Sequence, residues 1–271
     1  MAAKASPVQK GMSRVSDRAL FLFAGFVYLF LYAPILVLMV FSFNSTRSTQ
    51  VWTGFSTKWY GELLRDQSIL NAFYNSLTVG IVSTAIATAI GTFTALALTR
   101  YDFRGKGFAD TTIYAATVMP EIVVGVSLLV FFVAASFPLG ITTIIIAHVA
   151  FNISFVTIVV RARLSGMDRS IEEAAQDLGA TPVNTFLRVT LPLILPGVMA
   201  GALLAFTLSF DDFVITFFVS GVGSSTLPLK IYSMIKFGVS PVINALSTVI
   251  LISTMILIFG GSRIFMRKED S

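Results

Sequence analysis

Residues 111–160 read TTIYAATVMPEIVVGVSLLVFFVAASFPLGITTIIIAHVAFNISFVTIVV and carry one formal charge, that of Glu121. A helix needs about 20 mainly apolar residues to cross a bilayer, so the stretch is long enough for two membrane helices. The segment 136–140, with Pro138 and Gly140, favours a break between them. The stretch therefore predicts two transmembrane helices joined by a short turn.

The composition of the whole chain agrees with this prediction. Of its 271 residues, 55% are hydrophobic and 12% are charged, and the mean hydropathy is +0.85. Soluble proteins carry about 25% charged residues, so a soluble enzyme, a nucleic-acid-binding protein and a disordered chain are excluded. The chain has no cysteine and one histidine, His148, which excludes thiolate and multi-histidine metal sites.

Four further apolar stretches bring the predicted total to six transmembrane helices, and the predicted fold class is an all-α membrane protein. The predicted helices cover residues 19–46 and 67–99, two segments within 111–160, about 196–219 with an interruption at Asp211 and Asp212, and about 243–261. The predicted parts are a cytoplasmic segment (1–18), a six-helix transmembrane domain (19–262) and a cytoplasmic tail (263–271).

The basic residues are distributed unevenly between the two faces that six helices create. One face receives fourteen: Lys4, Lys10, Arg14, Arg18, Arg100, Arg104, Lys106, Arg161, Arg163, Arg169, Arg188, Arg263, Arg267 and Lys268. The other receives five: Arg47, Lys58, Arg65, Lys230 and Lys236. Because cytoplasmic loops of membrane proteins are enriched in lysine and arginine, both termini are predicted to be cytoplasmic.

The longest cytoplasmic connection, residues 161–195, reads RARLSGMDRSIEEAAQDLGATPVNTFLRVTLPLIL. Ser170 and Glu173 have the spacing of a capping box, which predicts a helix that starts at Ser170. Gly179 is placed to end that helix in the left-handed conformation. Thr181-Pro182 predicts the N-cap and first residue of another helix.

The predicted cytoplasmic helix is amphipathic and acidic. Its apolar stripe consists of Ile171, Ala174, Ala175 and Leu178, and its polar residues are Glu172, Glu173, Gln176 and Asp177. A helix that lies on anionic lipid normally has a basic polar face. The acidic face therefore favours a protein partner over the lipid surface.

The motif Glu173-Ala174-Ala175, Gly179, Val189, Leu191-Pro192 resembles the EAA loop of ATP-binding-cassette (ABC) importer permeases, with valine in place of isoleucine. The resemblance implies a type I ABC importer permease fold with a coupling helix that docks on a separate ATPase. The residues to which it assigns ATPase coupling are Ser170, Glu172, Glu173, Ala174, Ala175, Asp177, Leu178 and Gly179.

Further stretches resemble spermidine/putrescine permeases, and most closely the second permease subunit of putrescine importers: residues 51–60, 119–121, 209–215 and 221–232. This resemblance implies polyamine transport across the bacterial inner membrane. The implied partners are a second homologous permease, two ATPase subunits, a periplasmic polyamine-binding protein and membrane lipid, with no nucleic acid. ATP and Mg²⁺ belong to the ATPase, and no cofactor is expected in this chain.

Three acidic residues fall inside predicted helices: Glu121, Asp211 and Asp212. A charge at a helix centre costs about 2.5–3.5 kcal/mol on insertion scales, so each carboxylate needs a partner, water or a function. Neighbours on a helix point about 100° apart, so one aspartate is expected to face the pathway and the other a neighbouring helix or subunit. For Glu121, a structural role beside Pro120, which is expected to kink the helix, competes equally with a substrate role.

A polyamine presents ammonium groups on a flexible chain, which carboxylates and aromatic faces bind. The predicted pathway residues are Glu121, Asp211, Asp212, Phe213 and Tyr232. Other candidate aromatic residues are Phe217, Phe218, Trp52, Trp59 and Tyr60, for which an interfacial or packing role is the stronger expectation. His148 is likewise expected to be a packed helix residue.

Small residues predict close helix packing within the subunit or against a second permease: Ala87, Gly91 and Ala95 in one helix, and Gly197 and Gly201 in another. The chain has no phosphate-binding GxxxxGK[ST] motif and no convincing nucleophile–base pair, so a non-catalytic permease subunit is expected. The alternatives are the same importer with another solute and a secondary transporter with proton-binding carboxylates.

Overall fold

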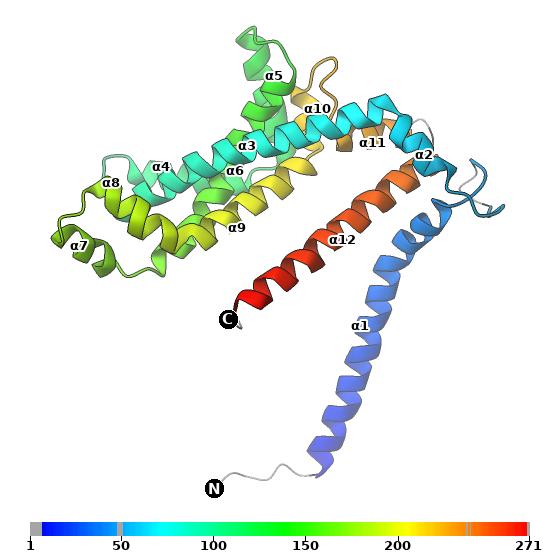
Figure 1. Cartoon of the computed structure of the whole chain (residues 1–271), viewed down its shortest axis with the longest axis horizontal. Helices are drawn as coiled ribbons and strands as arrows, with labels where there is room; N and C mark the ends of the chain where they lie inside the picture. The colour runs from blue at the N-terminus through cyan, green and yellow to red at the C-terminus, as the bar shows by residue number, and fades with distance from the viewer. Residues whose placement is uncertain (1–6, 48–50, 237, 239, 270–271) are drawn as a thin grey trace. The chain divides into compact units, whose positions relative to one another are not determined.

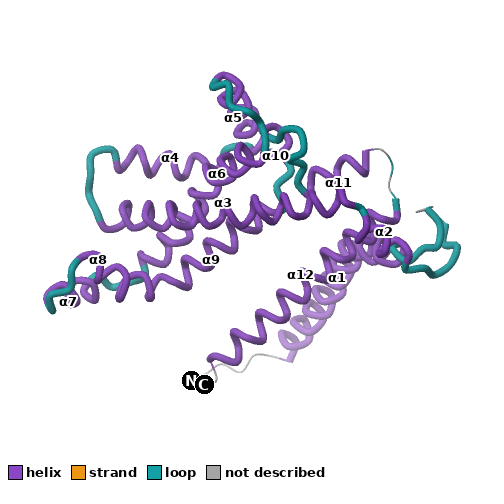
Figure 2. The backbone as a smooth tube through the Cα atoms, turned by 45° about the horizontal axis from the view of Figure 1, so that its top comes forward, coloured by secondary structure: helices purple, strands orange, loops and turns teal. Residues whose placement is uncertain are grey.

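The computed structural model describes residues 7–47, 51–236, 238 and 240–269, and these residues form helices and loops with one isolated bridge between Asn44 and Phe55 (Figure 1; Figure 2). The elements are α1 Pro7–Phe41, α2 Lys58–Arg65, α3 Gln67–Arg100, α4 Lys106–Val118, α5 Glu121–Ala134, α6 Ile141–Ser165, α7 Ser170–Asp177, α8 Pro182–Thr185, the π-helix η1 Phe186–Thr190, α9 Leu191–Phe210, α10 Val214–Val219, α11 Leu227–Lys236 and α12 Pro241–Glu269. They divide into two compact units, one of residues 67–233 and one of the segments on either side.

The all-α fold is confirmed, and the predicted count of six transmembrane helices is not exact. Within the described residues, four helices are long and apolar enough to cross a membrane, or five if the bent pair α4–α5 forms one span. The four lie at residues 19–41, 67–100, 141–165 and 182–210. The sixth predicted helix corresponds to α12, whose apolar segment at 241–256 is shorter than these.

The third predicted helix breaks at Pro120 instead of merely kinking there. α4 and α5 meet at an angle of 112°. Met119 adopts an extended backbone, with φ −63° and ψ 133°, as the steric clash with the following proline ring favours. Glu121 consequently becomes the first residue of α5 and does not lie mid-helix.

The fifth predicted helix also has different bounds. α9 begins at Leu191, ahead of the predicted start near Pro196, and Pro196 lies within it. The helix ends at Phe210, and a separate short helix, α10, begins at Val214. Asp211 and Asp212 therefore lie in a break between two helices, where a carboxylate can bond to free backbone amides.

The core of the 67–233 unit is a packed set of α3, α6 and α9, which lie side by side (Figure 1; Figure 2). A Cβ added at Gly91 would lie 2.8 Å from the Cβ of Val156, and one at Gly197 would lie 2.6 Å from the Cβ of Arg163. Ala87 and Ala95 are fully buried. The small residues of α3 and α9 thus provide close packing within this subunit.

The other unit contains α1, α2 and α12. Trp59 of α2 is 2% exposed, and its Nε1 donates to the backbone carbonyl of Asn44 at 2.6 Å. The Tyr60 hydroxyl and the Ser42 hydroxyl form a hydrogen bond of 2.7 Å. Trp59 therefore fastens α2 to the loop that follows α1.

Candidate functional site

The three predicted membrane carboxylates come from the starts of two helices that contact each other. Glu121 begins α5, and Asp211 and Asp212 immediately precede α10; a Cβ added at Gly125 of α5 would lie 3.4 Å from the Cα of Ile215 in α10. Helices α5 and α10 pack together, which brings the two helix breaks to the same region. Glu121 and Asp211 are exposed in this chain. The structure thus places the acidic residues of the predicted pathway in one cluster.

Asp212 differs from the other two carboxylates because both of its side-chain oxygens accept hydrogen bonds from the protein. Its Oδ1 accepts from the backbone amide of Ile215 at 3.2 Å. Its Oδ2 accepts from the backbone amide of Thr216 at 2.8 Å and from the Thr216 hydroxyl at 2.7 Å. Asp212 therefore caps the first turn of α10, and its side chain is 8% exposed.

His148 of α6 completes this arrangement. Its Nε2 lies 3.1 Å from Oδ2 of Asp212 and 3.0 Å from Oγ1 of Thr216. Its Nδ1 and the Oγ of Ser209 share a hydrogen bond of 2.6 Å, and Ser209 Oγ lies 3.0 Å from Ser83 Oγ. This polar network, which we define as Ser83, His148, Ser209, Asp212 and Thr216, connects α3, α6, α9 and α10.

The sequence analysis expected His148 to be a packed residue, and it is 2% exposed. The polar network was not predicted from the sequence. His148 contacts Ser209 through Nδ1 and Asp212 through Nε2, the reverse of the arrangement in a hydrolase triad, and Ser209 is 5% exposed. A single histidine in the stretch 141–160, which carries no lysine, arginine, aspartate or glutamate, was the available signal.

Aromatic rings lie beside the carboxylate cluster. The ring centroids of Phe213 and Tyr232 are 4.6 Å apart, and those of Phe213 and Phe217 are 5.6 Å apart. Phe217 and Tyr232 are about half exposed. The predicted residues Phe213 and Tyr232 therefore meet, and they form an apolar surface next to Asp211 and Asp212 that suits a methylene chain between ammonium groups.

The predicted cytoplasmic helix is α7, and its start is capped differently from the prediction. Ser170 is a helical residue, and the capping box with Glu173 is wrong. Instead, Oδ1 of Asp168 accepts from the backbone amide of Ser170 at 2.9 Å. That hydrogen bond holds the pKa of Asp168 below its ordinary value, because it stabilises the ionised carboxylate.

The end of α7 is as predicted. Gly179 has φ +89°, and its amide donates to the carbonyl of Gln176 at 2.9 Å. The amide of Ala180 donates to the carbonyl of Ala175 at 3.0 Å, which completes a Schellman motif. Thr181 caps α8 by accepting from the amide of Asn184, and Pro182 is the first residue of that helix.

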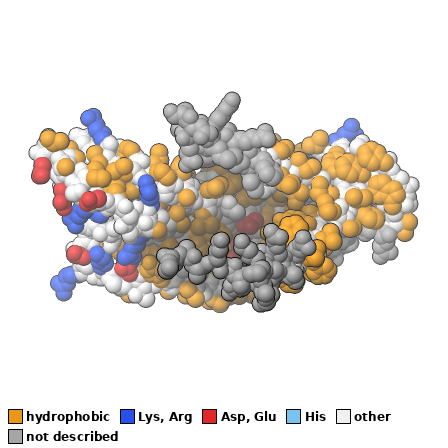
Figure 3. Space-filling model, turned by 90° about the horizontal axis from the view of Figure 1, so that it is seen from below, with side chains coloured by type: hydrophobic (Ala, Val, Ile, Leu, Met, Phe, Trp, Pro, Cys, Tyr) orange, Lys and Arg blue, Asp and Glu red, His pale blue; other side chains and the backbone are white. Residues whose placement is uncertain are grey.

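The surface of α7 is acidic and partly apolar. Glu173, Gln176 and Asp177 are exposed, and so are Ser170, Ala174 and Gly179. Leu178 is 90% exposed. Figure 3 shows acidic and basic side chains gathered at the left-hand end of the molecule, which α7 and α8 form. Glu172 is the exception, because its side chain turns inward.

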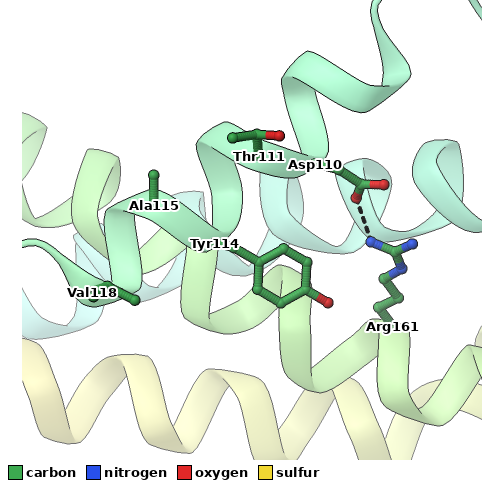
Figure 4. Close-up of a pocket in the computed structure, with 6 residues that line it drawn as sticks. All are labelled: Asp110, Thr111, Tyr114, Ala115, Val118 and Arg161. Carbon is green, nitrogen blue, oxygen red and sulfur yellow. Dashed lines mark hydrogen bonds and ion pairs between the residues drawn. The ribbon is translucent and has the colours of Figure 1, made fainter.

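A pocket of about 450 Å³ lies where α4 meets α6. Asp110 of α4 pairs with Arg161 of α6, and the Tyr114 ring lies one turn further along α4 (Figure 4). Asp110 neutralises the positive charge of Arg161, so this pair gives the pocket no net charge with which to attract a charged ligand. The sequence analysis did not find this pair, since 51 residues separate its members.

Residues 87–264 match the family described as the binding-protein-dependent transport system inner membrane component. The chain belongs to this family. It is therefore an inner membrane component of a binding-protein-dependent transport system, which argues against the alternative of a secondary transporter with proton-binding carboxylates. The match contains residues 161–195, predicted to be the coupling loop, and the three carboxylates Glu121, Asp211 and Asp212.

Relatives of this permease are similar over nearly its whole length. The putrescine transport system permease protein PotI of Escherichia coli (strain K12) is 46% identical over 93% of this chain and 92% of its own. The spermidine/putrescine transport system permease protein PotC of the same strain is 44% identical over 89% of this chain and 92% of its own. PotC of Haemophilus influenzae is 41% identical over 96% of this chain and 100% of its own.

Solved structures confirm the type I ABC importer permease fold. A chain of the bacterial ABC transporter for the acidic polysaccharide alginate has a TM-score of 0.75, with 17% identity over 97% of this chain and 100% of that chain. A chain of the MetNI methionine ABC transporter in an inward-facing conformation has a TM-score of 0.59, with 19% identity over 78% and 97%.

Proposed function

We propose that this chain is a permease subunit of an ATP-driven importer that carries polyamines such as putrescine or spermidine. The observation that carries the proposal is the 46% identity to a putrescine permease across almost the full length of both chains. The carboxylate cluster supports a cationic solute, since buried or clustered acids repel an anion.

In the proposed mechanism, Asp211 and Glu121 provide transient carboxylate contacts for the ammonium groups of the solute. The rings of Phe213, Phe217 and Tyr232 provide a surface for its methylenes and a weak cation–π attraction. Asp212 does not meet the solute, because its two oxygens accept four hydrogen bonds from the protein. A few weak contacts suit a pathway that must also release what it binds.

The proposed partners supply the energy and the solute. Two ATPase subunits bind ATP and Mg²⁺ and receive the exposed face of α7, where Leu178 offers an apolar anchor and Glu173 and Asp177 offer charge. A second homologous permease completes the pathway, and a periplasmic protein delivers the polyamine. The positive-inside rule supports cytoplasmic termini and a cytoplasmic α7.

The test is uptake of radiolabelled putrescine by the complex reconstituted in proteoliposomes with its ATPase and binding-protein partners. Wild type is expected to accumulate putrescine only when ATP is present on the ATPase side. Asp211→Asn is expected to raise the KM for uptake about ten-fold, the loss of roughly one charged contact. ATP-dependent uptake of another solute class with no putrescine uptake would overturn the polyamine assignment.

A further inference from the structure

Glu172 and Glu173 are adjacent in α7, but their side chains have opposite environments. The Glu172 side chain is 11% exposed, whereas that of Glu173 is 63% exposed. The resemblance to other permeases assigned both residues to ATPase coupling. An inward-facing Glu172 cannot contact a partner in this conformation, so it needs a different role.

Each carboxylate oxygen of Glu172 contacts a different element. Oε2 lies 2.9 Å from Nε of Arg100, the last residue of α3. Oε1 accepts from the hydroxyl of Thr190 at 2.7 Å, and Thr190 is the last residue of η1, immediately before α9. Arg100 is 13% exposed and Thr190 is 2% exposed, so water competes weakly for these contacts.

The dipoles of α7 and α3 stabilise the two charges of the Glu172–Arg100 ion pair. Glu172 lies in the first turn of α7, where the helix dipole favours a negative charge. Arg100 lies in the last turn of α3, where the dipole favours a positive charge. The ion pair therefore joins the complementary ends of two helices, and it is much less exposed to solvent than the pair Arg169–Glu173.

The two helices that Glu172 joins meet again beside the carboxylate cluster. Ser83 of α3 and Ser209 of α9 share a hydrogen bond of 3.0 Å within the polar network that holds Asp212. α3 and α9 also pack along their lengths. A displacement of α7 that pulls on Glu172 thus acts on α3, whose middle contacts the polar network through Ser83, and on α9, whose far end leads into Asp211.

We propose that Glu172 is a positioning residue that transmits movement of α7 to α3 and α9 through its contacts with Arg100 and Thr190. This inference rests on the proposed function, because it requires an ATPase that moves α7. It assigns different tasks to two adjacent glutamates: Glu173 faces the partner, and Glu172 connects α7 to the membrane helices.

The test measures solute uptake and ATP hydrolysis in the same proteoliposomes and compares their ratio. Glu172→Gln is expected to lower uptake per ATP hydrolysed about five-fold or more, as the loss of a coupling interaction predicts, while hydrolysis continues. The matched control is Asp102→Asn, another acidic residue of the cytoplasmic connections, whose side chain is 99% exposed and pairs with Lys106; it is expected to change that ratio less than about two-fold because exposed ion pairs contribute little. Equal ratios in Glu172→Gln and wild type would overturn the inference.

Two further variants test the same contacts independently of Glu172→Gln alone. Thr190→Val removes one hydroxyl at nearly constant shape, and it is expected to lower the same ratio even if Glu172→Gln does not assemble. In a double-mutant cycle, Arg100→Gln combined with Glu172→Gln is expected to be no worse than the more impaired single variant. Losses that multiply would show that the two residues act separately and would overturn the inference. Wild-type vesicles without polyamine uptake would instead refute the proposed function.

Discussion

Nε2 of His148 lies 3.1 Å from Oδ2 of Asp212, which ties the middle of α6 to the break between α9 and α10. The same carboxylate oxygen caps α10 through the amide of Thr216. His148 lies more than sixty residues earlier in the sequence. By holding Asp212, it helps to set the direction in which the side chain of the neighbouring Asp211 points.

This relationship predicts different consequences for the two adjacent aspartates. Asp212→Asn is expected to lower the stability of the purified complex by about 1–3 kcal/mol, because it leaves buried donors without their acceptor. Asp211→Asn, at an exposed position, is expected to change stability by less than about 0.5 kcal/mol. Thermal unfolding in detergent measures both, and equal losses would contradict the division of roles.

A second prediction concerns the packing of α3 on α6. Gly91→Ala is expected to destabilise the protein by about 1–3 kcal/mol, because the new Cβ would lie 2.8 Å from Val156 and 3.1 Å from the carbonyl of Ile153. The control is Gly107→Ala in α4, where nothing lies within 4 Å. It is expected to be neutral or to stabilise by up to about 1 kcal/mol. Unfolding temperatures that fall equally for both variants would refute this account.

Asn152 supports a third prediction. It is 1% exposed, and both polar atoms of its amide lack a hydrogen-bond partner among the described residues. An unpaired buried amide costs about 1–3 kcal/mol, so Asn152→Leu, of similar volume, is expected to keep or raise the unfolding temperature. Asn152→Asp serves as the contrast, because a buried charge is expected to lower the unfolding temperature. A fall for the leucine variant would show that Asn152 is paired in the assembled complex.

A fourth prediction concerns the start of α7. Asp168→Ala is expected to increase hydrogen exchange at the amide of Ser170 at pH 7, whereas Asp168→Asn retains an acceptor oxygen and keeps the protection. Because the pKa of Asp168 is lowered in the folded protein, its stabilising effect is complete above the ordinary aspartate pKa and is lost as the pH falls through the lowered one. Equal exchange in the alanine variant and wild type would remove Asp168 as the cap.

The all-α membrane fold and the coupling loop were predictable because they depend on local patterns. Apolar length predicted the membrane helices, and Gly179 and Thr181-Pro182 predicted the end of α7 and the start of α8. The break at Pro120 was underestimated, because a proline restricts its preceding residue but packing decides whether the helix kinks or stops. The start of α7 at Ser170 was predicted, but its capping residue was not, because Asp168 and Ser170 both suit a capping position.

The contacts that organise the site were not predictable because they join distant segments. Glu172 is indistinguishable from Glu173 by composition, and only the packing of α7 against η1 and α3 turns one inward. His148 and Asp212 likewise gave no local sign of their pairing. One sequence shows where polar residues occur in apolar helices, but their partners depend on how the helices pack.

The π-helix η1 has a consequence for the length of the chain between α7 and α9. A π-turn contains one residue more than an α-turn, so residues 186–190 hold an extra residue ahead of Pro192. Deleting one residue here would convert the segment to regular α-helix and rotate everything before it by about 100° relative to α9. A different face of α7 would then point inward in place of the face that carries Glu172. The rotation of α7 relative to α9 therefore depends on a single inserted residue.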